Sequence, residues 1–471
     1  MMSELLEVRN PRTGRIDYRA TMTGSEELAT AVQRLRAGSQ AWADAGVDQR
    51  VQVLKGFHRA LDKHRDQMIQ ALTSDTGRLK ESVLEVDAAL ATLDRWMAEA
   101  PGLLADPDPR PSNIDFIQVE QTGRPYPLVG IISPWNFPLL LALIDAVPAL
   151  LAGSTVLIKP SEVTPRFIEV AEIALRETPG LADVLAWTVG DGHIGAGVVD
   201  AVDLVCFTGS VATGRRVGER AAERFIPAFL ELGGKDAAIV LEDADIERAA
   251  RALAWGGMVN AGQSCMSIER IYAVETVHDQ LFDALVAEVG RLALNMPDIE
   301  SGEIGPVIAE AQIDILKSHL SDAIERGARI GCGGELVVGE EGGTWCRPTV
   351  LGDVDHGMKV MTEETFGPIL PVMRVTGADA AIKQANDTIY GLSAAVFTAD
   401  PGRARNVAAR LEAGAISIND ASLTSLVHTG EKQSFKQSGL GGSRMGPVAI
   451  RRFLRQQCYL VNPGVDDPWW F

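Results

Sequence analysis

The chain has 471 residues, of which 46% are apolar and 23% charged, and its 44 basic and 63 acidic residues give a net charge of −19. This length favours two or three domains, and the composition is globular rather than disordered, collagen-like or disulfide-rich. The acidic balance argues against a surface for nucleic acid or for an anionic membrane, since either would need a basic patch. A nucleotide cofactor stays open, because helix N-termini can hold phosphates.

The five cysteines have no paired spacing, so neither a disulfide framework nor a metal site is expected, and a reducing compartment fits better. The first residues, MMSELLEVRN, contain two Glu and lack the apolar region of a secretory signal. The most apolar stretch runs from Pro134 to Pro160, but Pro138, Asp145 and Pro148 interrupt it, which favours a buried helix over a membrane span. We therefore expect a soluble, cytoplasmic protein.

The first half of the chain predicts helices and then an alternation of strands and helices. Residues 26–100 have apolar side chains at helical spacing, and the alternating segment Ile114–Glu120 predicts a half-exposed strand followed by a Gly-Arg-Pro-Tyr-Pro turn. The next expected elements are strands at Leu128–Ile132, Thr155–Ile158, Leu204–Phe207 and Ala237–Leu241, with helices near 166–177 and from 211. This alternation predicts parallel βαβ units in a doubly wound sheet.

A second α/β series follows in the other half. Its expected elements are a helix near 245–259, a strand Arg270–Val274, helices at 278–293 and 309–326, and a final short strand Gln457–Leu460 before an Asp-Pro-Trp-Trp-Phe tail. The two isolated strands, near 114–120 and 457–461, are candidates for an element that bridges subunits, although two ordinary edge strands fit the pattern as well. We therefore predict an α/β protein with a dinucleotide-binding domain (1–106 and 126–233), a catalytic α/β domain (234–446) and a small β oligomerisation element (107–125 and 447–471).

One cysteine stands out from the others by its local context. Cys265 lies in Gly-Gln-Ser-Cys-Met, after the helical run Ala252–Val259, and a loop of small polar residues at a helix end can offer backbone donors to a thiolate. Cys206 lies within an apolar strand, and the remaining three are in glycine-rich, loop or edge segments. Cys265 is thus the best candidate nucleophile of the five.

Glu231 lies among apolar residues at the end of a predicted strand, in Phe-Leu-Glu-Leu-Gly-Gly-Lys. A carboxylate buried in this way can act as a base near neutral pH, taking a proton from a thiol or a water. The alternative is that Glu231 simply pairs with Lys235, and the local pattern favours neither.

Two further segments follow strands where dinucleotide folds bind phosphate and ribose. In Phe207-Thr-Gly-Ser, the small Gly209 would allow a pyrophosphate close to the backbone, and Ser210 could be a helix N-cap or a phosphate ligand. Lys159 and Glu162 directly follow the strand at 155–158 and could bond ribose hydroxyls, although a solvated loop pair is the alternative.

Taken together, these segments resemble the aldehyde dehydrogenase superfamily over almost the whole chain. Seven motifs occur in that family's order: Pro134-Trp-Asn-Phe-Pro, Lys159-Pro-Ser-Glu, Phe207-Thr-Gly-Ser, Glu231-Leu-Gly-Gly-Lys, Gly262-Gln-Ser-Cys, Glu364-Thr-Phe-Gly-Pro and Asn386-Asp-Thr-Ile-Tyr-Gly-Leu. Each is weak alone, but seven in order at compatible spacing exclude coincidence.

The resemblance implies an oxidoreductase that converts an aldehyde to a carboxylic acid through a thiohemiacetal and a thioester on Cys265. It implies Glu231 as general base, and an oxyanion hole made by the Asn136 side-chain amide and the Cys265 backbone N–H. Thiolate attack creates an oxyanion for Asn136 to stabilise, hydride leaves to the nicotinamide, and Glu231 activates the hydrolytic water.

The resemblance also implies an NAD cofactor, with NADP as an alternative, and a homodimer or homotetramer with a small aldehyde as substrate. It places Lys159 and Glu162 at the adenosine ribose and Trp135 and Ser210, next to Gly209, along the adenosine and pyrophosphate path. Glu364 would hold the nicotinamide ribose, with Phe366 beside it. Because Glu162 would repel a 2′-phosphate, NAD is the expected preference.

The chain departs from the family pattern at three places. Asp145 stands where relatives usually carry Lys, Arg444 stands where they often carry Glu, and Glu431-Lys-Gln-Ser434 replaces a usual Pro-Phe-Gly-Gly. Because each charge change alone would leave a buried charge unpaired, we expect Asp145 and Arg444 to form a salt bridge of reversed polarity. A one-residue slip at Gly441-Gly442 would instead expose Arg444 to solvent.

Two rival functions remain from sequence. A non-catalytic relative is disfavoured by the joint presence of Cys265, Glu231 and Asn136, and a CoA-acylating relative is disfavoured by the base Glu231. The substrate stays open as well. Aliphatic residues (Leu141, Ile144, Val259 and Met266) favour a medium-chain or aromatic aldehyde, whereas Lys432 and His428 favour an acidic semialdehyde.

Overall fold

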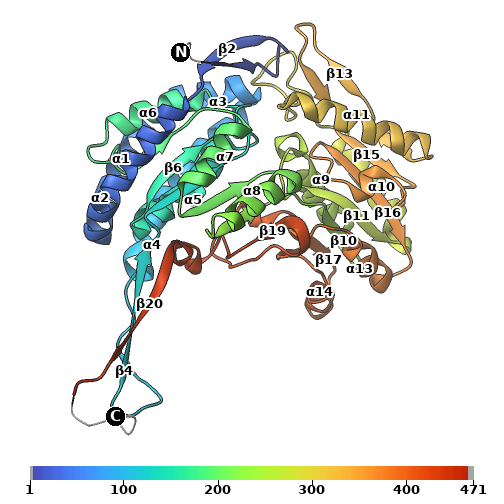
Figure 1. The fold of residues 1–471 in the computed structure, drawn as a ribbon. Helices are drawn as coiled ribbons and strands as arrows, with labels where there is room; N and C mark the ends of the chain where they lie inside the picture. The colour runs from blue at the N-terminus through green and yellow to red at the C-terminus, as the bar shows by residue number, and fades with distance from the viewer. Residues whose placement is uncertain (1–3, 465–471) are drawn as a thin grey trace.

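The computed structural model describes residues 4–464 and contains two lobes and a projecting β-ribbon (Figure 1). Four helices form the first part of one lobe, and four more alternate with strands of its sheet; the other lobe holds the remaining six. The helices are α1 Ser25–Asp44, α2 Gly46–Lys63, α3 Arg65–Thr76, α4 Leu79–Leu103, α5 Pro138–Ala152, α6 Phe167–Arg176, α7 Gly192–Ala201, α8 Val211–Glu223, α9 Ile246–Met258, α10 Glu275–Val289, α11 Glu310–Glu325, α12 Lys359–Thr362, α13 Ala378–Asn386 and α14 Pro401–Ala408.

The first lobe is built on a six-stranded sheet of order β19-β9-β8-β5-β6-β7. Its strands are β5 Leu128–Ile132, β6 Thr155–Lys159, β7 Leu185–Trp187, β8 Leu204–Thr208, β9 Ala228–Glu231 and the edge strand β19 Gly439–Leu440. All neighbours among β5 to β9 pair in parallel, and β19 pairs antiparallel with β9. The expected doubly wound parallel sheet is thereby confirmed.

Helix α5 carries the most apolar stretch of the sequence into the core of this lobe. Pro138 occupies its first turn and Gly153, with a φ of 103°, follows its last residue, which are the preferred residues for starting and ending a helix. Thirteen of its fifteen residues are buried, and they pack on the sheet and on α2 and α4. The predicted buried helix is confirmed, and within residues 4–464 no helix is long and apolar enough to cross a membrane.

The second lobe is built on a seven-stranded sheet of order β12-β15-β16-β11-β10-β17-β18. Its strands are β10 Asp236–Val240, β11 Ile268–Val274, β12 Arg329–Cys332, β15 Thr349–Gly352, β16 Ile369–Val375, β17 Ser393–Phe397 and β18 Ala415–Ile418. Only β12 runs antiparallel to its neighbour. The expected second α/β unit is confirmed, although its later strands, from β12 onward, are not among the predicted elements.

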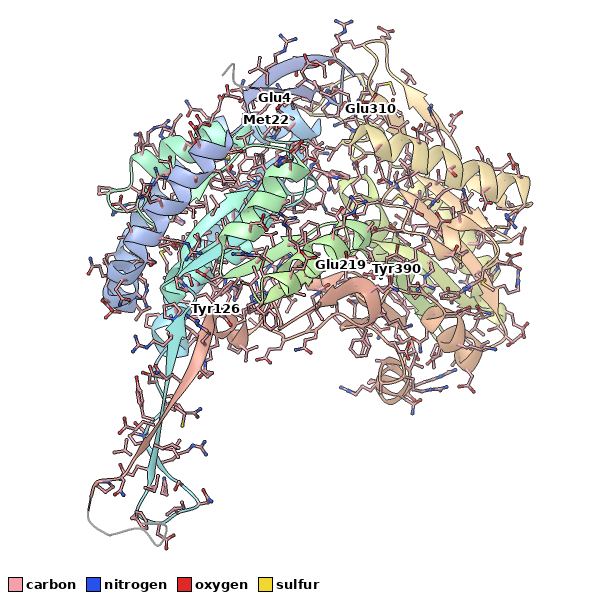
Figure 2. All side chains as sticks on the ribbon, in the orientation of Figure 1. Glu4, Met22, Tyr126, Glu219, Glu310 and Tyr390 are labelled. Atoms are coloured by element: carbon pink, nitrogen blue, oxygen red, sulfur yellow. The ribbon has the colours of Figure 1, made fainter. Side chains whose placement is uncertain are left out.

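Two isolated strands of the sequence pair with each other in a three-stranded sheet of order β20-β4-β3. Its strands are β3 Arg110–Pro111, β4 Gln118–Pro125 and β20 Leu454–Val461. Strands β4 and β20 pair antiparallel over their whole length and project from the body (Figure 1), and Figure 2 shows Tyr126 where the ribbon leaves it. We call residues 118–125 and 454–461 the ribbon.

The bounds predicted for the first ribbon strand were wrong at both ends. Residues 114–117 form a turn closed by the Ile117 N–H on the Ile114 carbonyl (2.8 Å), and the strand starts only at 118. The expected turn at 123–127 is instead partly strand, since Gly123 pairs with Gln456 and Pro125 with Leu454. The pairing partner lies more than 300 residues away, and local sequence carries no trace of it. The Asp-Pro-Trp-Trp-Phe tail lies outside the described residues.

Two small hairpins complete the fold, and neither was predicted. They are β1 Leu5–Arg9 with β2 Ile16–Thr21, and β13 Leu336–Val338 with β14 Thr344–Cys346. The β1–β2 hairpin contacts both lobes: the Arg9 guanidinium donates to the carbonyls of Val307 and Ile308 (3.1 and 3.0 Å), and the Thr23 N–H donates to the Val189 carbonyl (2.8 Å).

Candidate active site

Polar side chains gather where the parallel strands of the first sheet end. Ser133 follows β5, Lys159 ends β6, and Thr188 follows β7. The hydroxyls of Ser133 and Thr188 are buried without a hydrogen-bond partner among the described residues. Buried hydroxyls without partners at the carboxyl edge of a parallel sheet fit a ligand that supplies hydrogen bonds there, as a dinucleotide does.

Lys159 and Glu162 lie together at this edge. The Lys159 side chain is only 3% exposed, and its Nζ donates to the Glu162 carboxylate (3.1 Å) and to the Pro160 carbonyl (3.0 Å). A solvated loop pair, the alternative weighed from sequence, does not describe this buried ammonium group. The pair presents one donor group and one acceptor group beside the ends of β5 and β7.

The Gly209-Ser210 turn leads from β8 into α8. The Ser210 hydroxyl accepts the Thr213 N–H (3.3 Å), so Ser210 is the N-cap of this thirteen-residue helix, as predicted. A Cβ on Gly209 would lie 2.6 Å from the ring of Phe207, so the position has no room for a side chain. The turn thus brings the backbone N–H groups at the N-terminus of α8 to the end of β8, a position that favours an anionic group.

One buried carboxylate, that of Glu269, fixes the loop that carries Glu364 and Phe366. Glu269 accepts the N–H groups of Thr365 (2.7 Å) and Phe366 (2.8 Å) and the Lys235 ammonium (2.8 Å). Phe366 has a φ of 49°, in the left-handed region that non-glycine residues seldom adopt. Such strain persists only where surrounding contacts fix it, and it is frequent at functional sites.

The same loop reaches both the first lobe and the motif after Glu231. The Phe366 and Trp135 rings meet edge-to-face with centroids 5.3 Å apart, and the Glu364 carboxylate accepts the Gly234 N–H (3.1 Å). Burial raises the pKa of Glu364 to about 8, Glu269 adds to the rise, and the Gly234 N–H opposes it. The structure thus brings together two of the candidate cofactor residues predicted on separate motifs.

Cys265 follows a short turn with unusual backbone geometry. Asn260, Ala261 and Gly262 all have positive φ (56°, 53° and 69°), and a Cβ on Gly262 would lie 2.3 Å from the Gly367 carbonyl. This turn reverses the chain after α9 and presses it against the Glu364 loop. Cys265 itself is partly exposed, and its carbonyl packs so closely on Gly234 that a Cβ there would lie 2.5 Å away.

The thiol of Cys265 lies in a field that disfavours its ionised form. Burial raises its pKa to about 12, the Lys432 ammonium opposes the rise, and the carboxylates of Asp236, Glu364 and Glu231 add to it. A thiol held in this way is protonated at neutral pH, and only its thiolate is a strong nucleophile. Nucleophilic chemistry at this cysteine therefore requires a base within reach.

The other cysteines have structural surroundings, as predicted for Cys206. Cys206 is buried in β8 and Cys346 in β14, and burial raises the pKa of both thiols. Cys332 is partly exposed and donates to the Pro348 carbonyl (3.7 Å), and Cys458 is exposed on the ribbon.

Glu231 ends β9 and does not pair with Lys235, which was the alternative from sequence. The Lys235 ammonium donates to Glu269 (2.8 Å) and Thr365 (2.8 Å), and its side chain is fully buried. The Glu231 side chain is partly exposed and forms no ion pair within the described part of the chain. The charge of Glu231 contributes to the rise in the pKa of the Cys265 thiol, so the two groups are close enough to interact electrostatically.

Asn136 ties the first lobe to the Cys265 loop. Its side-chain amide is 3% exposed and donates to the Gln263 carbonyl (3.0 Å), two residues before Cys265. An amide NH₂ has two N–H groups, so one fixes the orientation of the Asn136 side chain and the other is left for a ligand. Asn136 of the first lobe thus bonds the loop that carries Cys265, and these are two of the three residues predicted as one catalytic set.

The predicted salt bridge between Asp145 and Arg444 is present and buried. The Arg444 Nη2 atom lies 2.7 Å from an Asp145 carboxylate oxygen, and the two residues are 8% and 1% exposed. Arg444 also donates to the Thr208 hydroxyl, and Thr208 pairs in register with Glu231. The alternative, a slipped alignment with Arg444 in solvent, is wrong.

Sequence reasoning missed a third member of this cluster. Arg452 donates to the same Asp145 carboxylate, and its guanidinium stacks on the rings of Phe229 and Phe453 at 5.0 and 4.9 Å. Burial alone would raise the pKa of Asp145, but the two guanidinium groups hold it below its usual range. One carboxylate therefore compensates two buried cations.

Replacing Asp145 with asparagine is expected to destabilise the first lobe by about 3–5 kcal/mol, because two buried guanidinium groups lose their anion. This corresponds to a fall of roughly 6–20 °C in the unfolding midpoint of a domain of this size, measured by calorimetry. The matched control is Asp200→Asn, which breaks the half-exposed Arg220–Asp200 pair and should cost at most about 1 kcal/mol. Equal shifts for both variants would show that the buried cluster contributes no more than a surface pair.

Other residues around the site also had no signal in the sequence. Arg78, Glu85 and Asn260 contact the Asn136 segment, and Glu269 supports the Glu364 loop. Each is a charged or amide residue that becomes buried by contacts across the fold. The one usable hint is a charge on an apolar helical face, as at Glu85, which shares the buried face of α4 with Ala89 and Thr92.

The comparisons with known proteins agree with this geometry. The sequence model of the aldehyde dehydrogenase family matches residues 2–458. A 4,4′-diapolycopene aldehyde oxidase from Methylomonas is 36% identical and covers 98% of this chain and 87% of its own length. The structure of "Putative Aldehyde Dehydrogenase PutA" from Anabaena variabilis is 52% identical, with a TM-score of 0.97 over 99% of this chain and 100% of its own. An aldehyde dehydrogenase from Mycobacterium tuberculosis complexed with NAD⁺ is 31% identical, with a TM-score of 0.92 over 99% and 96%.

Proposed function

Because the chain belongs to the aldehyde dehydrogenase family, we propose that it oxidises an aldehyde to a carboxylic acid at Cys265, with Glu231 as general base. The observation that carries this proposal is the hydrogen bond between Asn136 on one lobe and the Cys265 loop on the other. Asn136 bonds the loop of Cys265, and Glu231 and Cys265 share one electrostatic environment.

The proposed reaction starts with removal of the Cys265 proton by Glu231, which the raised pKa of the thiol makes necessary. The thiolate attacks the aldehyde carbon, and the free N–H of the Asn136 amide, with the Cys265 backbone N–H, stabilises the oxyanion. A bound NAD(P) would supply the acceptor for the hydride that leaves this oxyanion. Loss of the hydride leaves a thioester on Cys265, and Glu231 gives its first proton to solvent. Glu231 then takes a proton from water, the hydroxide adds to the thioester carbon, and the carbon–sulfur bond breaks. Glu231 returns the proton to the departing Cys265 sulfur, which releases the acid and the free thiol.

The cofactor site that we propose uses residues from both lobes. Lys159 and Glu162 would bond the adenosine ribose, and Ser210 with the Gly209 backbone would hold the pyrophosphate at the N-terminus of α8. The unpartnered hydroxyls at this edge and the missing side chain at Gly209 support the fit. Glu364 would bond the nicotinamide ribose, with Trp135 and Phe366 lining the path between the lobes.

We expect kcat/KM with NAD to exceed that with NADP, because the Glu162 carboxylate would repel a 2′-phosphate at short range. Glu162→Gln removes this repulsion and should shift the ratio toward NADP, without loss of the hydride-transfer rate. The measurement is kcat/KM for both cofactors in the wild type and in this variant. A wild-type preference for NADP would refute the role of Glu162.

For the substrate, we propose a medium-chain or aromatic aldehyde. Three aliphatic side chains expected to line the approach to Cys265 are partly exposed: Leu141, Val259 and Met266. A second candidate, an acidic semialdehyde, is favoured by Lys432, whose ammonium acts on the Cys265 thiol and has no carboxylate partner among residues 4–464.

Initial rates over a panel of aliphatic, aromatic and acidic aldehydes test both the function and the substrate class. An apolar substrate should have the highest kcat/KM, and Lys432→Met should lower the value for an acidic semialdehyde by a larger factor than the value for an apolar aldehyde, because the Lys432 ammonium also favours the Cys265 thiolate. Equimolar release of carboxylate and reduced cofactor identifies hydrolysis. If no aldehyde in the panel yields more reduced cofactor than the heat-inactivated protein does, the proposed function is wrong.

We further propose the predicted division into a dinucleotide-binding domain (1–106 and 126–233), a catalytic domain (234–446) and an oligomerisation element (107–125 and 447–471), in a cytoplasmic homodimer or homotetramer. The exposed side chains of Tyr459 and Leu460 on the projecting ribbon, 41% and 71% exposed, support an assembly role. The free state of all five cysteines supports a reducing compartment.

A further inference from the structure

A buried ion pair lies directly behind the segment that carries Asn136. Arg78 precedes α4 and Glu85 lies two helical turns further on, so both face the start of α5. Their side chains are 2% and 0% exposed, with Arg78 Nη2 and Glu85 Oε2 3.4 Å apart. The proposed mechanism uses neither residue.

Arg78 reaches the backbone of Asn136. Its Nη2 donates to the Asn136 carbonyl, and its guanidinium stacks over the ring of Phe137 at 4.5 Å. The Asn260 side chain donates to the same carbonyl (3.3 Å) and to the Gln263 carbonyl (2.9 Å). The carbonyl of Asn136 is thus held by two side-chain donors, one of them charged.

The buried position of the Arg78 guanidinium is unfavourable for the free energy of folding. Its Nε and Nη1 atoms are buried without a hydrogen-bond partner among the described residues, and burial lowers its pKa. The backbone beneath it is nevertheless fixed on both sides, because the Ser82 hydroxyl donates to the Arg78 carbonyl (2.6 Å) and the Asn295 amide donates to the Gly77 carbonyl (2.9 Å). A buried charge with unused donors contributes little to the stability of the fold. A role other than stability therefore has to explain why Arg78 is buried here.

Glu85 holds the next part of the same segment. Its Oε1 accepts the N–H groups of Leu139 (2.8 Å) and Leu140 (3.1 Å), which are free donors of the first turn of α5. The N-cap residue of α5, Phe137, has no side chain that could cap the helix. Glu85 therefore supplies the cap from a neighbouring helix, where its charge also meets the positive end of the helix dipole.

We propose that Arg78 and Glu85 are positioning residues for the oxyanion amide: they clamp residues 136–140 so that the Asn136 side chain keeps a fixed orientation toward the Cys265 loop. The inference rests on the proposed role of Asn136. With its carbonyl bound by Arg78 and one amide N–H bound by the Gln263 carbonyl, Asn136 has a single orientation left for its second N–H. A preorganised donor needs no reorganisation as charge develops on the aldehyde oxygen.

The test is a double-mutant cycle between the pair and Asn136. The variant Arg78→Met with Glu85→Gln removes both charges at similar volume, which protects folding better than breaking one half of a buried pair. In the otherwise wild-type enzyme it should lower the single-turnover rate of hydride transfer by roughly 10- to 100-fold, the effect of a misplaced catalytic group. The affinity for NAD, measured by fluorescence titration, should not change.

In an Asn136→Ala background the same double substitution should change the rate by less than about 2-fold, since no amide remains to be oriented. An equal loss in both backgrounds would mean a merely structural role and would overturn the proposal. So would an unchanged rate in the wild-type background.

Two further outcomes separate this inference from the proposed function. If Asn136→Ala alone leaves the rate unchanged, the oxyanion assignment fails and the positioning role fails with it. If Asn136→Ala lowers the rate but the double substitution of Arg78 and Glu85 does not, only the positioning role is wrong. Should the double variant fold poorly, Arg78→Lys keeps a positive charge opposite Glu85 but loses the planar guanidinium that bonds the Asn136 carbonyl, and its smaller rate loss should likewise vanish in the Asn136→Ala background.

Discussion

Replacing Cys265 with alanine is expected to abolish aldehyde oxidation, with kcat lowered roughly 10⁴- to 10⁶-fold, the loss found when a covalent nucleophile is removed. No neighbouring thiol can substitute, because Cys206 and Cys346 are buried inside strands. The affinity for NAD should stay the same, since the proposed contacts of Lys159 and Ser210 lie on the other lobe. The measurements are reduced-cofactor formation and a binding titration.

The matched control for this prediction is Cys458→Ala, which removes an exposed thiol from the ribbon and should keep wild-type turnover. Labelling by a thiol reagent should be blocked by an aldehyde substrate at Cys265 and not at Cys458. Wild-type turnover in the Cys265→Ala enzyme would refute the assignment of the nucleophile and, with it, the thioester route.

Replacing Glu231 with glutamine is expected to lower the steady-state rate by about 10²- to 10⁴-fold, the usual contribution of a general base. The reason is the thiol itself: with the pKa of Cys265 raised to about 12 by burial, little thiolate forms without a proton acceptor. Hydrolysis of the thioester needs a base as well. Initial rates across a pH range, with and without added hydroxylamine as an alternative acyl acceptor, measure the two steps.

The control here is Glu219→Gln, an exposed carboxylate on α8 (Figure 2), which should have no effect. If hydroxylamine restores turnover in the Glu231→Gln enzyme, deacylation is the step that fails. An unchanged rate and pH profile would mean that Glu231 is a structural carboxylate at the end of β9.

The sequence predicted best those elements whose partners are close in the chain. Strands β5, β6 and β8 are fully buried in a parallel sheet, so each is a short continuous apolar run with clear ends. Strand β4 is different, because its residues are half-exposed and its bounds are set by a partner near the other end of the chain. Its pattern alone placed the strand four residues too early.

The candidate site shows the same division. Cys265, Glu231 and Asn136 were predicted because each lies in a motif with a recognisable order along the chain, and in the structure the Asn136 side chain bonds the loop of Cys265. Arg78 immediately precedes α4 and Glu85 lies in it, and a charge on a helix is ordinarily a solvated residue. What makes them part of the site is the packing of α4 on α5, which a single sequence does not contain.

The cluster around Asp145 was half predicted. Asp145 and Arg444 could be paired because each replaces a charge of opposite sign in the family pattern, and buried charges need partners. Arg452 carried no such signal, since an arginine near the chain end is usually a surface residue. It is buried because its guanidinium stacks on two phenylalanine rings.

The ribbon has a consequence for how the protein is made. Arg124 and Gln457, which bond across it, are 333 residues apart. At a translation speed of about 5–20 residues per second, β4 leaves the ribosome roughly 17–70 seconds before its partner strand exists. Asp145 also lacks its ion-pair partners for most of this interval, because both Arg444 and Arg452 are synthesised late in the chain. A nascent or prematurely ended chain would therefore present an open strand edge and an uncompensated buried carboxylate at once, the two features by which chaperones and proteases can distinguish it from the finished protein.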